Sequence, residues 1–472
     1  MIELAKEQEK VILVGVSLPG QEDTGQLLDE LAFLADTAGA REVGRVIQSR
    51  DQIHPGTYVG TGKIMEIKDL LWETDASGII CDDELSPAQM KNLQDELEVK
   101  VLDRTLLILD IFAARARTSE GKIQVELAQL KYRQTRLAGF GTALSRLGGG
   151  IGTRGPGEKK LEMDRRLIRE RIGQLNRELK AVQRHRQVTR EQRMESLLPV
   201  AAIVGYTNAG KSTLLNTLTG AGILAEDKLF ATLDPTTRNL KLPAGQEILL
   251  TDTVGFIRKL PHHLIEAFRS TLEEARYADL IIHMADVANP QVEAQMHTVY
   301  ETLRELGVED KPVITVLNKR DLVEDLPVIR DFRADCTVAL SAKTGEGLEE
   351  FLHMIEGVLR SREIHIEEIY PYRDGGKIQL IRRYGEIEEE AYQEEGIRIK
   401  AYLPARLYDK VRPSWGRIAK NACGRPGRRW SNPGSRIRSR TGRGLDRTGS
   451  VPWQEGDVSG RYSCQWCSRS PV

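Results

Sequence analysis

Residues 200–212 read VAAIVGYTNAGKS, an apolar run followed at once by the pattern Gly-x-x-x-x-Gly-Lys-Ser. The apolar run predicts a buried strand and the residues after it a helix, which is the context that a phosphate-binding loop requires. Glycines let successive backbone N–H groups turn toward a phosphate, and the start of the helix adds partial positive charge. We expect Lys211 to bridge β- and γ-phosphate oxygens and Ser212 to ligate Mg²⁺. The predicted loop consists of Gly205, Tyr206, Thr207, Asn208, Ala209, Gly210, Lys211 and Ser212.

The alternation of apolar runs and helical patterns continues after this loop. Parallel strands with helices on both faces appear in a sequence as short, continuous apolar runs. We therefore expect an α/β domain with a doubly wound parallel sheet over residues 197–362. Its predicted strands are Val200–Val204, Glu247–Thr251, Leu280–Ala285, Val313–Leu317 and Thr337–Leu340.

The motif Asp252-Thr253-Val254-Gly255 follows the second of these strands. From a strand end the carboxylate of Asp252 can reach a metal ion through water, and the Gly255 N–H can meet a γ-phosphate. The next residue is Phe256, which cannot orient an attacking water as a glutamine can. We leave the catalytic residue unassigned and expect slow intrinsic turnover that a partner accelerates. The alternative is that Phe256 only packs beneath this segment while another side chain, such as Arg258, positions water unaided.

Two further motifs predict the base. Asn318-Lys319-Arg320-Asp321 closes the strand Val313–Leu317, and the Asp321 carboxylate can accept two hydrogen bonds from the N1–H and N2–H₂ edge of guanine. Adenine has no such pair of donors and would leave the carboxylate unpaired, so the motif favours GTP over ATP. Asn318 can brace the base and its loop, and the stem of Lys319 can cover the ring. Ser341-Ala342-Lys343 follows the last strand, where a backbone N–H can meet the guanine oxygen.

Between the phosphate loop and Asp252 lies the segment FATLDPTTR, residues 230–238. A threonine in this segment would complete the Mg²⁺ shell with GTP and leave it after hydrolysis. The pattern alone does not choose among Thr232, Thr236 and Thr237.

Length and composition exclude several classes of protein. The chain has 472 residues, 40% of them hydrophobic and 29% charged, which is typical of about three or four globular domains. No apolar run approaches the roughly 20 residues of a membrane-spanning helix, and MIELAKEQEK is no secretory leader. Five cysteines are too few for a disulfide framework. We expect a cytoplasmic monomer without a membrane span, and leave partial membrane association open.

The net charge of −1 is the sum of acidic and basic segments that nearly cancel. Residues 1–110 hold 10 basic and 22 acidic side chains, whereas residues 131–190 hold 16 and 5, and residues 411–472 hold 13 and 3. A concentrated basic segment indicates a polyanionic partner, the alternative being a solvated helix face.

Four further parts flank the sheet domain. Residues 1–112 alternate strand and helix patterns and predict a small α/β domain. Residues 113–196 carry apolar positions at coiled-coil spacing around a glycine-rich tip at 148–157, which predicts a basic, antiparallel helical hairpin. Residues 363–410 predict a small α+β domain. Residues 411–472 contain few aliphatic side chains, which predicts an atypical basic tail without fixed structure. The tail is either natural and RNA-binding, or an out-of-frame continuation of the gene.

The order GYTNAGKST, FATLDPTTR, DTVGFIRKLP, NKRD and SAKTGEG, preceded by LGGGIGTRGPGE at the hairpin tip, resembles the HflX family of ribosome-associated GTPases, of the Obg–HflX type. The resemblance covers roughly residues 10–410. It implies that Thr232 binds the metal with Ser212, and that the nucleotide contacts include Phe230, Ala231, Thr232, Leu233 and Asp234. It also implies that the hairpin enters the large ribosomal subunit, and that the protein splits stalled or idle ribosomes with ribosome-stimulated GTP hydrolysis.

The basic hairpin then has a predicted role, because arginine and lysine neutralise RNA phosphates and glycines permit close approach of the backbone. The candidates for contact with ribosomal RNA are Arg133, Arg136, Arg146, Arg154, Lys159 and Lys160.

Two other classes of function remain as alternatives. One is an RNA-remodelling NTPase that acts on ribosomal RNA and has a separate adenine-nucleotide site in the N-terminal domain. The other is a non-enzymatic, nucleotide-sensing scaffold, which the intact Lys211 and Ser212 disfavour.

Overall fold

The computed structural model describes residues 8–20, 23–145, 156–195, 198–220, 228–233, 235–259, 274–308 and 310–413. Several predictions lie outside these residues: Asp234, Arg146, Arg154, the glycine-rich tip before residue 156, and the tail after residue 413. The side chains of Lys159 and Lys160 also lie outside the described part. Among the described residues, no helix is both long and apolar enough to cross a lipid bilayer.

The N-terminal domain is a four-stranded parallel sheet in the order β2-β1-β3-β4. Helix α3 begins at Pro87 because Ser86 and Gln89 form a capping box. The sequence Gly60-Thr61-Gly62-Lys63 is the start of α2, with Gly60 at the N-cap. The elements are β1 (Glu9–Ser17), α1 (Thr24–Thr37), β2 (Ala40–Ser49), α2 (Thr61–Thr74), β3 (Gly78–Cys81), α3 (Pro87–Leu97), β4 (Lys100–Asp103) and α4 (Arg104–Arg115).

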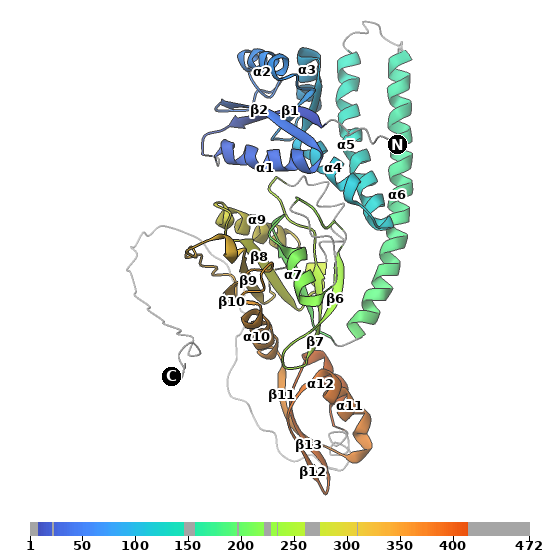
Figure 1. Cartoon of the computed structure of the whole chain (residues 1–472). Coiled ribbons are helices and arrows are strands. Elements are labelled where there is room, and N and C mark those ends of the chain that lie inside the picture. The colour runs from blue at the N-terminus through green and yellow to red at the C-terminus, as the bar shows by residue number, and fades with distance from the viewer. Residues whose placement is uncertain are drawn as a thin grey trace, which may run out of the picture. The chain divides into compact units, whose positions relative to one another are not determined.

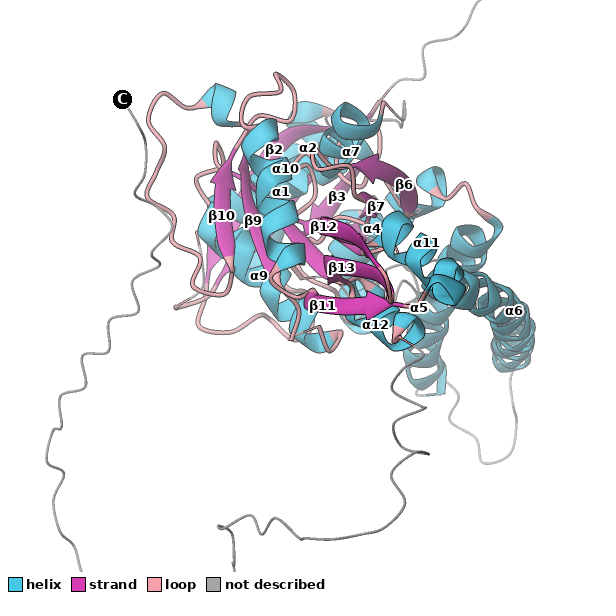
Figure 2. Ribbon diagram, turned by 90° about the horizontal axis from the view of Figure 1, so that it is seen from below, coloured by secondary structure: helices cyan, strands magenta, loops and turns pink. Residues whose placement is uncertain are grey.

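Two long helices form the predicted hairpin. Helices α5 (Ser119–Ser145) and α6 (Pro156–Glu195) lie side by side in both views (Figure 1, Figure 2). Arg171 donates two hydrogen bonds to the carboxylate of Glu126, and Arg165 donates to the carbonyl of Leu137. Because the partner on α5 moves toward the N-terminus as the residue on α6 moves toward the C-terminus, the pair is antiparallel.

The third domain contains a six-stranded sheet in the order β10-β9-β8-β5-β7-β6. The five predicted strands are present and parallel, but the edge strand β6 pairs antiparallel with β7, so the sheet is not wholly parallel as predicted. Strand β6 has the polar sequence TTRNLK and therefore carries no apolar signal. The elements are β5 (Val200–Gly205), α7 (Lys211–Thr219), β6 (Thr236–Lys241), β7 (Glu247–Asp252), β8 (Leu280–Asp286), α9 (Val292–Glu305), β9 (Val313–Asn318), the 3₁₀ helix η1 (Arg320–Leu322), β10 (Cys336–Ala339) and α10 (Leu348–Arg360).

A small α+β domain follows α10. Its antiparallel sheet has the order β11-β13-β12, and the alternating pattern of β13 places Ile397, Ile399, Ala401 and Leu403 in a core against α11. The elements are β11 (Ile364–Tyr370), the 3₁₀ helix η2 (Tyr372–Asp374), α11 (Gly375–Tyr384), β12 (Glu386–Gln393), β13 (Gly396–Leu403) and α12 (Ala405–Val411).

Candidate functional site

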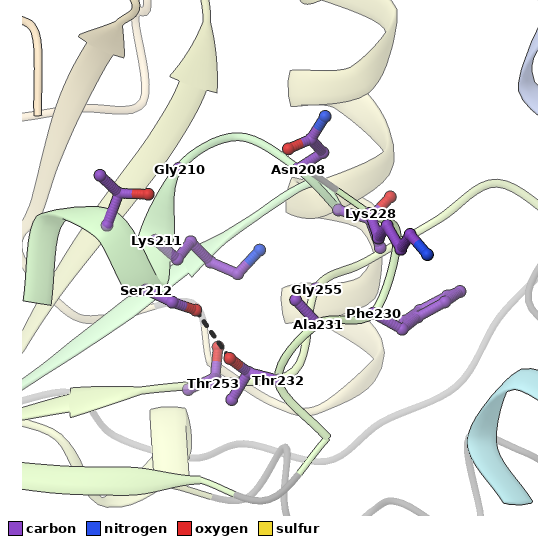
Figure 3. Close-up of a pocket in the computed structure, with 12 residues that line it drawn as sticks. Asn208, Gly210, Lys211, Ser212, Lys228, Phe230, Ala231, Thr232, Thr253 and Gly255 are labelled. Carbon is purple, nitrogen blue, oxygen red and sulfur yellow. Dashed lines mark hydrogen bonds between the residues drawn. The ribbon is translucent and has the colours of Figure 1, made fainter. Parts of the chain in front are cut away.

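The loop between β5 and α7 carries the residues that we expect to bind phosphate (Figure 3). Helix α7 begins at Lys211 with no side-chain cap, so its first N–H groups remain available to an anion. Gly210 has φ 94°, and a Cβ at this position would lie 2.2 Å from Nδ2 of Asn318. Only glycine fits there, because any side chain would be strained and would also displace the Asn318 amide.

Lys211 is buried beneath this loop. Its Nζ donates to the carbonyl of Gly205 at 3.2 Å and to that of Tyr206 at 2.7 Å. Burial lowers the pKa of Lys211 to about 8, although the charge of Asp252 opposes the shift. Negative phosphate oxygens at the mouth of the cavity would favour the charged form of this lysine.

Three oxygen-bearing side chains meet below Lys211. Ser212 Oγ lies 2.7 Å from Thr232 Oγ1, and it donates to Asp252 Oδ2, also at 2.7 Å. Figure 3 shows Ser212 and Thr232 pointing toward one another. Thr237 instead bonds with Thr251 across β6 and β7. Of the three threonines that the sequence left open, the structure brings Thr232 to Ser212.

This group of side chains fits a divalent cation. The buried Oδ1 atom of Asp252 has no hydrogen-bond partner among the described residues, and all the candidate ligands are oxygens, as Mg²⁺ prefers. Burial raises the pKa of Asp252, while Lys211, Ser212 and Thr232 oppose that rise. A cation beside the carboxylate would favour its charged form.

The residues after Asp252 turn back against the phosphate loop. Phe256 donates its N–H to the carbonyl of Gly205 at 3.0 Å and accepts from the N–H of Thr207 at 2.8 Å. Its ring is 2% exposed, and Arg258 is 8% exposed. Phe256 is therefore a packing residue, and neither it nor Arg258 lines the phosphate cavity.

Asn318 connects the base-recognition motifs to the phosphate loop. Its Nδ2 donates to the carbonyl of Ala209 at 2.8 Å, and its Oδ1 accepts from the N–H of Ala342 at 2.9 Å. Lys319 has a left-handed backbone and is paired with Asp286 at 2.8 Å. Asp321 lies exposed in η1, where its carboxylate is accessible to a base.

Sequence reasoning missed two residues near the site. Lys228 lines the phosphate cavity together with Phe230, Ala231 and Thr232, and Asp286 orients Lys319. Asp286 ends β8 and directly follows the predicted strand Leu280–Ala285. A polar residue at the carboxyl end of a parallel strand was the signal that could have found it. Lys228 carries no comparable signal, because it lies in no recognisable motif.

One RNA-contact candidate is placed differently from the prediction. Arg136 is buried, and its Nη2 donates to Asp103 Oδ2 at 2.5 Å and to the carbonyl of Leu85 at 2.9 Å. Its guanidinium also stacks over the ring of Tyr132 at 3.4 Å. Arg136 therefore ties α5 to the N-terminal domain and is not available to RNA in this structure, whereas Arg133 on the same helix is exposed.

Comparison with known proteins decides the family. Three family models match: "GTP-binding GTPase N-terminal" over residues 25–113, "GTP-binding GTPase Middle Region" over 115–193 and "50S ribosome-binding GTPase" over 200–319. A GTPase HflX of Lacrimispora saccharolytica is 64% identical over 408 residues, which is 86% of this chain and 96% of that protein. The chain belongs to the HflX family of GTPases.

Other relatives are more distant. The GTPase HflX of Escherichia coli is 42% identical over 400 residues, 84% of this chain and 94% of that protein. A crystal structure of a GTP-binding protein from Sulfolobus solfataricus in complex with GDP is 26% identical and covers 74% of this chain and 98% of that one, with a TM-score of 0.40. Membership in the HflX family makes the chain a GTPase that binds guanine nucleotides and has a ribosome-binding GTPase domain.

Proposed function

We propose that this HflX-family GTPase binds the large ribosomal subunit through the α5–α6 hairpin and splits stalled or idle ribosomes. The GTP-bound form engages the subunit, the subunit stimulates hydrolysis, and hydrolysis resets the protein. Ser212 and Thr232 would hold the Mg²⁺ ion, which would supply positive charge beside the phosphates. We place this activity in the cytoplasm.

The observation that carries the proposal is the exposed basic surface of α6, the longer helix of the hairpin. Exposed arginine and lysine side chains can replace the counterions of RNA phosphates. This basic surface of α6 comprises Arg169, Arg177, Lys180 and Arg184.

The buried position of Phe256 supports the requirement for stimulation. No side chain of residues 256–258 faces the phosphate cavity, since Phe256, Ile257 and Arg258 are all buried and none lines it. Water placement in the transition state then comes from the partner in this proposal.

Light scattering of intact ribosomes mixed with the protein and a non-hydrolysable GTP analogue tests the proposal. We expect scattering to fall as the subunits separate, and added salt to weaken the effect. The double variant Arg169→Glu, Arg177→Glu should lose splitting, whereas Arg41→Glu, Lys68→Glu, the same charge change on exposed residues of the N-terminal domain, should keep it. Splitting by the α6 variant at the wild-type rate would contradict the proposal.

A nucleotide competition separates the proposal from the RNA-remodelling alternative. Asp321→Asn removes an acceptor for the guanine N1–H and N2–H₂ groups, so GDP should lose affinity and fail to support splitting. A separate adenine-nucleotide site would instead leave an ATP-dependent activity that ADP inhibits and that Asp321→Asn does not change.

A further inference from the structure

The phenol of Tyr206, the second residue of the phosphate loop, lies between the GTPase domain and the N-terminal domain. Its hydroxyl donates to the carboxylate of Glu30 on α1 and accepts from the backbone N–H of Arg258 at 2.9 Å. Only 3% of Tyr206 is exposed. The phosphate loop, the segment after Gly255 and the N-terminal domain therefore share one buried hydrogen-bond network.

Arg104, the first residue of α4, extends this network. The guanidinium is 2% exposed and donates to Glu30, to Asp82 Oδ1 at 2.8 Å and to the carbonyl of Arg258 at 3.3 Å. The N–H and the carbonyl of Arg258 are thus both held, one by Tyr206 and the other by Arg104. Buried charged groups of this kind are costly to leave without their partners.

Lys259 makes the last of these contacts. Its Nζ lies 2.7 Å from Asp82 Oδ2 and 2.6 Å from Asp83 Oδ1. The backbone of Lys259 has φ 49°, a left-handed conformation that non-glycine residues adopt rarely. We call the four side chains Glu30, Asp82, Arg104 and Lys259 the clamp, because they fix residues 256–259 against the N-terminal domain.

Gly255 directly precedes the residues that the clamp contacts. A Cβ at Gly255 would lie 2.8 Å from Cα of Thr207 and 2.9 Å from Nζ of Lys211. The cavity beside these residues has a volume of about 50 Å³. A γ-phosphate must fit between Lys211 and Gly255, so it requires Gly255 and the residues after it to move outward. The β-phosphate would lie in the loop itself and would not require Gly255 to move.

The other segment that responds to the nucleotide also contacts the N-terminal domain. The ring of Phe230, two residues before Thr232, packs edge-on against Phe112 of α4 with ring centroids 4.6 Å apart. Phe230 also has a left-handed backbone, with φ 54°. The N-terminal domain therefore touches the residues on both sides of the γ-phosphate position.

We propose that the clamp sets the preference between GDP and GTP: it holds Gly255 inward, and the γ-phosphate binds only at the expense of the clamp contacts. Linkage makes the effect reciprocal, so GTP loosens the docking of the N-terminal domain, and a partner that draws this domain away strengthens GTP binding. This inference depends on guanine-nucleotide binding and not on the proposed action at the ribosome.

Equilibrium titrations of GDP and of a non-hydrolysable GTP analogue, with Mg²⁺ and without ribosomes, test the inference in the full chain. Lys259→Met removes the ammonium group that pairs with Asp82 and Asp83, and Glu30→Gln removes the charge that pairs with Arg104. Both substitutions roughly keep the size of the side chain. In both variants we expect the affinity for the GTP analogue to rise about tenfold, while that for GDP stays within about twofold. Lys100→Met, which removes an ion pair with Glu9 in the same domain, is the matched control and should change neither affinity.

Two results would overturn the inference: an unchanged ratio of the two affinities in both clamp variants, or an equal loss of both affinities, which would indicate a purely structural role. Lys259→Arg, which keeps the charge, should restore the wild-type ratio. Because no ribosome is present, failure here leaves the splitting proposal untouched, and failure of splitting leaves this inference untouched.

Discussion

The side-chain amide of Asn318 donates a hydrogen bond to the carbonyl of Ala209, at a distance of 2.8 Å. The loop that follows β9 is thereby fastened to the loop that binds phosphate. The Oδ1 atom of the same amide accepts a hydrogen bond from the backbone N–H of Ala342. One side chain therefore joins three loops, each of which follows a strand end. The loops that we expect to bind the base and the phosphates are joined for this reason.

Asn318→Ala should therefore weaken GDP and GTP alike. The substitution leaves the Ala209 carbonyl and the Ala342 N–H without their partner, and we expect a loss of roughly 2 kcal/mol, or about 30-fold in affinity. Fluorescence titration with both nucleotides measures the loss. Asn239→Ala, at an exposed position of the edge strand β6, is the control. A loss confined to GTP would contradict the role of Asn318 as a brace.

The fold was largely predictable from the sequence because the strands that form the centre of the sheet are continuous apolar runs. Strand β6 was missed because its polar residues at a sheet edge show neither apolar continuity nor alternation. The phosphate loop, the Asp252–Gly255 motif and the two base motifs could be placed because each one follows a strand whose end is visible in the sequence.

The contacts between domains were not predictable. Arg136 shows why. Counting charges along the sequence assigns every arginine of a basic helix to a polyanionic partner, but Arg136 pairs with Asp103 of another domain. The role of Tyr206 was hidden for the same reason, since its partner Glu30 is 176 residues away in the chain. Such pairs follow from how the domains pack, which no local pattern encodes.

Thr232→Ala should affect the triphosphate selectively. The side chain lies beside Ser212 and Asp252, so its loss removes an oxygen ligand that we expect the metal ion to use only with GTP. We expect affinity for a GTP analogue to fall roughly tenfold, the effect of losing a contact of about 1.5 kcal/mol, with GDP affinity within twofold.

Titrations with and without EDTA measure the effect of Thr232→Ala, since metal removal should abolish the difference between wild type and variant. Thr237→Ala, whose hydroxyl bonds Thr251, is the matched control. Equal effects of the two substitutions would argue against Thr232 as a metal ligand.

Arg136→Met should destabilise the protein without changing its response to RNA. Removing the guanidinium leaves the buried carboxylate of Asp103 without its charged partner, and we expect a loss of about 3 kcal/mol in the free energy of unfolding. Thermal unfolding measures this loss. Arg133→Met, on the exposed side of the same helix, should weaken the response to RNA and leave the free energy of unfolding unchanged. An unaltered unfolding temperature in Arg136→Met would refute the structural role.

Asp331 should make the stability of the GTPase domain depend on acid pH. Burial raises the pKa of Asp331, but the His283 ring, whose Nδ1 lies 3.9 Å from Oδ2, and the hydroxyls of Tyr300 and Thr315 lower it below the usual value. Each of the two hydroxyls donates to Oδ2 at 2.6 Å. A depressed carboxyl pKa gives stabilisation that is complete above the unfolded pKa of about 3.9 and is lost as the pH falls through the folded pKa.

Asp331→Asn should therefore reduce the free energy of unfolding by about 2 kcal/mol at pH 7, because charge-assisted hydrogen bonds become neutral ones. The difference from wild type should begin to shrink below pH about 4, because the Asp331 carboxyl of the unfolded wild-type chain takes up a proton there while that of the folded protein stays charged. Urea unfolding between pH 3 and 7 follows both proteins, with Asp325→Asn on the exposed surface as the control. A constant difference across this range would show that Asp331 stabilises the domain by packing, not through its charge.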